Sequence, residues 1–167
     1  MIAGVDGCRA GWLVALSESW PLKSDPQLIV CRDFNTVVTV TSTFEVVSVD
    51  IPIGLPSDGT RRLCDEQAKE RLGVAHTRVF HAPSRPTLVA ETGEQFQQLY
   101  RQVTGIGAGY PVWGIVPKVK DVDSVMTPAL QGRIHEFHPE LAWQRLAGRV
   151  LASKHTAEGI AERIDVL

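Results

Sequence analysis

Two aspartates, each placed where a short apolar run ends, are the residues of this sequence best suited to chemistry. Asp6 follows the apolar run 2–5, and Asp50 follows the run 46–49 and precedes a loop with two prolines. In open α/β sheets, ligands bind where strands end in loops. Two carboxylates ~5 Å apart repel by ~3 kcal/mol at an effective dielectric constant of about 20, so such a pair calls for a cation. The pattern predicts a site for Mg²⁺ or Mn²⁺, ions that activate water and stabilise charge on phosphate.

Hydrophobic spacing and turn residues predict an α/β fold around these two acids. Helix 60–72 is expected to be capped by Ser57, Asp58 or Thr60, and Pro117 is expected to interrupt the helix near 112–126. Segment 35–44 fits a helix or, by its Val and Thr content, a strand; we choose a helix because a crossover is needed before the next strand. Strands are expected at 2–5, 12–16, 28–32, 46–49 and 133–137, and further helices begin at Thr92, Pro139 and Glu158.

The order of these elements predicts how the strands lie in the sheet. The short link between the first two strands favours an antiparallel hairpin, and the simplest right-handed crossover places the fourth strand beside the first. The expectation is a single domain over 1–167 with a mixed five-stranded sheet of order 3-2-1-4-5. A helical insertion of about 57–130 separates strands four and five. In this arrangement Asp6 and Asp50 lie side by side at one end of the sheet.

Other residues with chemical potential lie close to the two aspartates in this scheme. Glu136, on the fifth strand, is either a third metal ligand and catalytic acid or an ordinary strand residue. Arg9 follows Asp6 closely and fits a phosphate contact as well as an ion pair with a neighbouring acid. His138 fits a general base, although its place before a helix favours a capping role, and His81 is expected in a surface loop.

The chain resembles the domain of unknown function 429 family over nearly its whole length. The resemblance rests on six segments in the order of the family: Gly4–Arg9, Asp50–Pro56, Arg62–Asp65, Val79–Arg85, Pro117–Asp123 and Glu136–Glu140. The family is described as predicted nucleases with a ribonuclease H-like fold, so the resemblance implies that fold and a nuclease activity. Its members usually continue past the segment that resembles 155–159 into a further helix with another aspartate. The resemblance therefore implies a short or C-terminally truncated member.

Three basic residues of the insertion match positions in those segments. Arg62, Arg85 and Lys118 either line a phosphate-binding cleft or, with Asp65, form a salt-bridge network that holds the insertion in place. The region 61–120 carries an excess of basic residues, whereas the whole chain has a net charge of −2. A basic region beside an acidic pair suits a phosphate-bearing ligand, although a solvated helical surface has the same composition.

Composition limits the classes to which the protein can belong. Hydrophobic residues make up 44% and charged residues 22% of 167 residues, which is typical of one globular domain. No apolar run approaches the ~18 residues of a membrane span, and the N-terminus lacks the features of a signal peptide. Three scattered cysteines, Cys8, Cys31 and Cys64, favour reduced thiols in a cytoplasmic protein.

Three hypotheses for function follow. The first is a metal-dependent nuclease or phosphoesterase that hydrolyses a nucleic-acid phosphodiester or a small phosphoester. The second is an actin-like nucleotide-binding phosphotransferase, because residues 6–11 resemble a phosphate loop, although a second such loop is not found in the sequence. The third is an inactive interaction module with the same fold, and an exposed last helix would suit pairing as a homo-oligomer.

Overall fold

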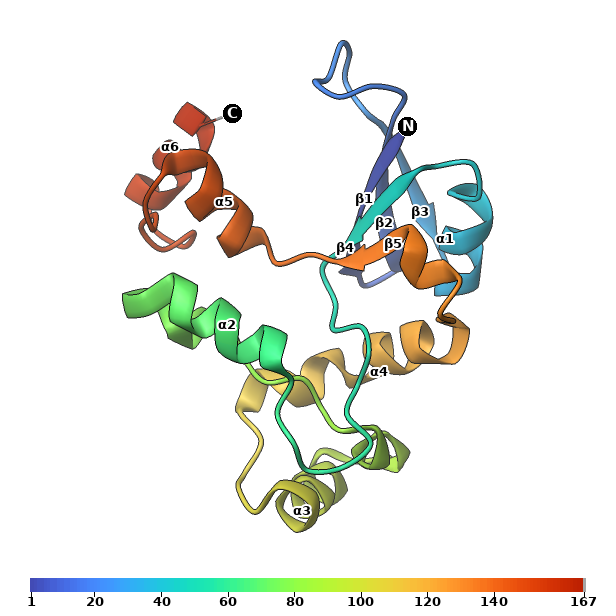
Figure 1. Ribbon diagram of the computed structural model, residues 1–167, viewed down its shortest axis with the longest axis vertical. Helices are drawn as coiled ribbons and strands as arrows, with labels where there is room; N and C mark the ends of the chain where they lie inside the picture. Colours follow the sequence, from blue (N-terminus) through green and yellow to red (C-terminus); the bar gives the residue numbers. More distant parts are fainter. Residues whose placement is uncertain (167) are drawn as a thin grey trace.

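A computed structural model describes residues 1–166 and confirms the five-stranded mixed sheet in the predicted order (Figure 1). The sheet order is β3-β2-β1-β4-β5. β1 pairs antiparallel with β2, β2 pairs antiparallel with β3, and β4 pairs parallel with both β1 and β5. The strands are β1 (Ile2–Cys8), β2 (Gly11–Ser17), β3 (Gln27–Cys31), β4 (Val46–Val49) and β5 (Ile134–Glu136).

Helices account for most of the remaining described residues. The α-helices are α1 (Phe34–Val40), α2 (Leu63–Leu72), α3 (Gly93–Thr104), α4 (Tyr110–Val125), α5 (Pro139–Ala147) and α6 (Ala157–Val166). Short 3₁₀-helices are η1 (Gly73–Arg78), η2 (Arg85–Val89) and η3 (Leu130–Gly132). The segment for which the sequence allowed two alternatives is helical, because the Asp33 side chain caps α1 by accepting a 2.8 Å hydrogen bond from the backbone N–H of Thr36.

Two details of the predicted helices are wrong. Helix α2 begins at Leu63, because the Asp58 carboxylate accepts hydrogen bonds from the backbone N–H and hydroxyl of Thr60 and forms a separate turn upstream. Helix α4 continues through Pro117 instead of stopping there. Pro117 is exposed, so water can reach the carbonyl that loses its helical hydrogen bond.

The main core lies between one face of the sheet and helices α1 and α4. Trp12 and Val47 from the sheet, Phe34 from α1 and Val119 from α4 are each fully buried in it. The rings of Trp12 and Phe34 meet edge to face with centroids 5.2 Å apart. This packing fixes the strands and so the positions of the residues at their carboxyl ends.

The opposite face of the sheet is open. Leu13, Leu28, Val30 and Val46 share this face by their register and are 40%, 62%, 58% and 41% exposed. In Figure 1, α5 and α6 lie beside α2, away from the sheet. The strand residues that alternate with the core residues therefore face solvent.

Two smaller apolar clusters hold the insertion and the C-terminal helices together. One joins α3 to α4 through Phe96, Tyr100 and Val116. The other joins α2 and η1 to Leu141 of α5 and to Val150. No helix within residues 1–166 is both long enough and apolar enough to cross a membrane.

Candidate functional site

Asp6 and Asp50 lie on neighbouring parallel strands, at the open face of the sheet. The register pairs Val5 with Val49, and the backbone N–H of Asp50 donates a 3.0 Å hydrogen bond to the carbonyl of Val5. Asp6 and Asp50 directly follow this pair, so they lie opposite each other on strands that are ~4.8 Å apart. Asp6 also pairs with Leu13, which belongs to the open face. The structure therefore brings the two predicted ligands together where solvent can reach them.

Neither aspartate side chain forms a hydrogen bond or an ion pair with any residue that the structure describes. Partial burial raises the pKa of Asp50 above its ordinary value, and the nearby charge of Asp6 raises it further. The charges of His138 and Lys154 lower the pKa of Asp50, and Glu136 raises it slightly. The Asp50 carboxyl group thus remains open to solvent but is crowded by protein and by a like charge.

Glu136 lies apart from this pair because of its place in the register. It pairs with Val49, whose side chain faces the core, so it points to the opposite side of the sheet from the two aspartates. Its carboxylate accepts hydrogen bonds from the guanidinium group of Arg62 at 2.7 and 2.9 Å and from the backbone N–H of Ile53 at 2.9 Å. The structure does not place Glu136 as a third ligand beside the two aspartates.

Arg62 lies at the centre of a buried ion-pair network. Its side chain is 7% exposed and also binds the carboxylate of Asp65, itself 5% exposed, which in turn accepts the backbone N–H of Ala82 at 2.9 Å. Burial alone would lower the pKa of Arg62, but hydrogen bonds to Glu136 and Asp65 raise it above its ordinary value. Arg62 thus connects β5 to the start of α2, and a phosphate could reach it only by displacing a carboxylate.

The other two basic residues of the insertion also have partners within the protein. Arg85 forms a two-pronged ion pair with Asp123 of α4, with nitrogen–oxygen distances of 2.8 and 3.0 Å. Lys118 donates to the backbone carbonyl of Gly11 and lies over the Trp12 ring, 4.7 Å from its centroid. Both contacts attach α4 to neighbouring elements. For Arg62 and Arg85 the geometry matches the salt-bridge alternative better than a phosphate cleft, whereas Lys118 is held by a backbone carbonyl and an aromatic ring.

Arg9 differs from these three residues. It is exposed in the turn between β1 and β2, three residues after Asp6, and the described part of the chain offers it no ion pair. An arginine without a carboxylate partner keeps all of its N–H groups for a ligand. Arg9 therefore remains a candidate phosphate contact at the edge of the acidic pair.

Two residues near Asp50 come from segments that sequence reasoning treated as secondary or did not consider. His138 is the last residue before α5, and its Nδ1 atom is buried without a hydrogen-bond partner in residues 1–166. Lys154 is exposed in the link between α5 and α6. No local pattern marks Lys154, because only the packing of the C-terminal helices brings its charge near Asp50.

The arrangement supports a two-carboxylate cation site and no larger one. Within the described residues, no group of three His, Cys, Asp or Glu side chains is close enough to hold a metal ion. Mg²⁺ is usually bound by one or two carboxylates together with water and substrate oxygens, so two aspartates fit this ion.

A protein-family description matches residues 4–167, which is essentially the whole chain, and reads "Protein of unknown function (DUF429)". No curated protein and no solved structure matches the chain.

Proposed function

Since the chain belongs to the DUF429 family, whose description names no activity, we propose from its site that it is a metal-dependent phosphoesterase acting on nucleic-acid phosphodiesters. Asp6 and Asp50 would hold Mg²⁺ or Mn²⁺ at the carboxyl ends of β1 and β4. Glu136 is left out of the ligand set because it binds Arg62.

The observation that carries this proposal is that two adjacent carboxylates have no ion-pair or hydrogen-bond partner in residues 1–166, although the charges of His138 and Lys154 lie near Asp50. By contrast, Glu136, Asp65 and Asp123 each have an arginine within hydrogen-bond distance. Asp6 and Asp50 have no such partner in the part of the chain described. Their repulsion of ~3 kcal/mol at ~5 Å would be outweighed by the attraction of both carboxylates to a divalent cation.

The residues around the pair can assist hydrolysis. A divalent ion held by Asp6 and Asp50 would supply positive charge to the phosphate and would lower the pKa of water. Arg9, three residues after Asp6, and Lys154, whose charge lies near Asp50, are exposed cations that can serve as phosphate contacts. His138 lies near enough to Asp50 to influence its charge and can accept a proton from water or release one to the leaving oxygen.

Divalent-ion binding tests the proposal directly. The Tm of the full chain should rise when Mg²⁺ or Mn²⁺ is added, by about 5–10 °C at an ion concentration of about 100 times Kd. Asp6→Asn and Asp50→Asn should lose this rise, whereas Asp25→Asn, an exposed aspartate of the β2–β3 loop, should keep it. Cleavage of short single-stranded RNA and DNA should depend on the same two residues.

Other outcomes would favour the alternative functions. No rise in wild-type stability with either ion would refute the metal site. Stabilisation by ATP but not by oligonucleotides would favour the actin-like phosphotransferase. An absence of stabilisation by ions, ATP and oligonucleotides would favour an interaction module, for which the exposed apolar residues of the open sheet face are suited.

A further inference from the structure

A small pocket with a mixed polar and apolar lining lies within the insertion and shares no residue with the acidic pair. It lies between the segments 59–61 and 81–84 on one side and the end of α3 on the other, and its volume is about 80 Å³. At about 30 Å³ for each water molecule, this space holds about two or three waters or one small oxyanion group.

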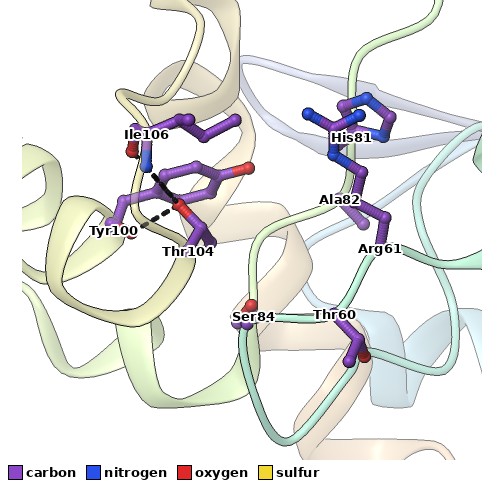
Figure 2. Close-up of a pocket in the computed structure, with 9 residues that line it drawn as sticks. Thr60, Arg61, His81, Ala82, Ser84, Tyr100, Thr104 and Ile106 are labelled. Atoms are coloured by element: carbon purple, nitrogen blue, oxygen red, sulfur yellow. Dashed lines mark hydrogen bonds between the residues drawn. The ribbon is translucent and has the colours of Figure 1, made fainter.

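Two nearly buried side chains line this pocket with hydroxyl groups that have no protein partner. Tyr100 and Ser84 are 5% and 2% exposed, and their hydroxyl groups form no hydrogen bond with residues 1–166. In Figure 2 the Tyr100 ring extends from α3 so that its hydroxyl oxygen points into the gap. The Nδ1 atom of His81 is buried and also lacks a partner. Hydroxyl groups that open onto a cavity without a protein partner are free to hydrogen-bond with a polar ligand, so these side chains indicate that the pocket can take one.

The charge of the lining indicates the sign of that ligand. Arg61 lies beside His81 on the wall opposite Tyr100 (Figure 2). One of its nitrogens lies 3.3 Å from Glu66, which leaves its other N–H groups available. Burial, followed by the charge of Arg61, lowers the pKa of His81, so its imidazole is neutral at neutral pH. The pocket is therefore lined by one permanent cation and several neutral donors, while the carboxylate of Glu66, which contacts Arg61 and lies 3.8 Å from His81 Nε2, is outside the lining.

We propose that this pocket binds a phosphoryl group, either as free phosphate or as the terminal phosphate of a nucleotide. The donors come from three separate segments, so they approach the cavity from several directions. A phosphoryl group offers three strong acceptor oxygens in a tetrahedral arrangement, whereas a carboxylate offers two in one plane. Arg61 supplies the charge, and the hydroxyls of Tyr100 and Ser84 supply neutral hydrogen bonds.

Calorimetric titration of inorganic phosphate into the full chain, without divalent ions, tests the proposal. Arg61→Gln should weaken phosphate binding by about tenfold, because it removes the charge-assisted contact. Tyr100→Phe keeps the packed ring and should weaken binding by about threefold, the effect of one neutral hydrogen bond. Arg71→Gln, an exposed arginine of α2 outside the pocket, should bind phosphate like the native protein.

Further arms of the titration separate the ligand sources and the two sites. Tighter binding of AMP than of phosphate would assign the site to a nucleotide end, and equal binding would assign it to the phosphoryl group alone. Asp6→Asn should bind phosphate normally, which makes this result independent of the metal site. The proposal is overturned if phosphate does not bind, if acetate binds equally well, if neither pocket variant weakens binding, or if Asp6→Asn abolishes it.

Discussion

Replacing Arg62 by methionine is expected to destabilise the protein substantially, because it leaves two carboxylates unpaired. Asp65 is 5% exposed and would become an isolated buried charge, whereas Glu136 is 31% exposed and can regain some hydration. Removing one partner of a buried ion pair costs about 3–5 kcal/mol. Because one of the two acids is partly hydrated, we expect a loss near the lower end, about 3 kcal/mol, or ~6–12 °C in Tm for a chain of this size.

Urea denaturation followed by tryptophan fluorescence measures this loss. Arg61→Met is the matched control, because the neighbouring Arg61 is 52% exposed and forms only a surface contact with Glu66. That control should lose less than about 1 kcal/mol. Equal, small losses for both variants would refute the network and would return Arg62 to the set of possible phosphate contacts.

Two further predictions concern single aspartates. The raised pKa of Asp50 means that the folded protein holds this proton more tightly than the unfolded chain, so its charge reduces stability as the pH rises above 3.8. Without divalent ions, Asp50→Asn should therefore be more stable than the native protein at neutral pH and equally stable below pH 3.8. If the two proteins have equal unfolding midpoints at neutral pH as well, this prediction is contradicted. Asp121 accepts hydrogen bonds from Trp12 Nε1 at 2.7 Å and from the backbone N–H of Phe34 at 3.0 Å. Asp121→Ala should lose about 1–3 kcal/mol in the same denaturation assay, and an unchanged midpoint would show that water replaces the carboxylate.

The fold and the acidic pair could be predicted because their signals are local or depend on simple topology. Apolar runs ending in Asp6 and Asp50 mark two strand ends, and a right-handed crossover places those ends side by side. For the segment that contains the helix at 34–40, the sequence fits a helix or a strand, and the cap provided by Asp33 explains why the helix forms. The predicted start of α2 is wrong because residues 58–60 form a turn whose sequence resembles a helix cap.

The roles of Glu136, Arg62 and His81 depended on contacts between distant segments. A shift of one residue in the pairing of β5 with β4 would move Glu136 to the face of the two aspartates, and no local pattern sets that register. Arg62 binds both Asp65, three residues away, and Glu136, which is 74 positions away, and the local sequence can indicate only the first of these partners. His81, expected in a surface loop, has a side chain only 19% exposed and lines a pocket together with residues at the end of α3. Periodicity along the chain reveals which residues are buried, but the partner of each charge is set by the three-dimensional packing.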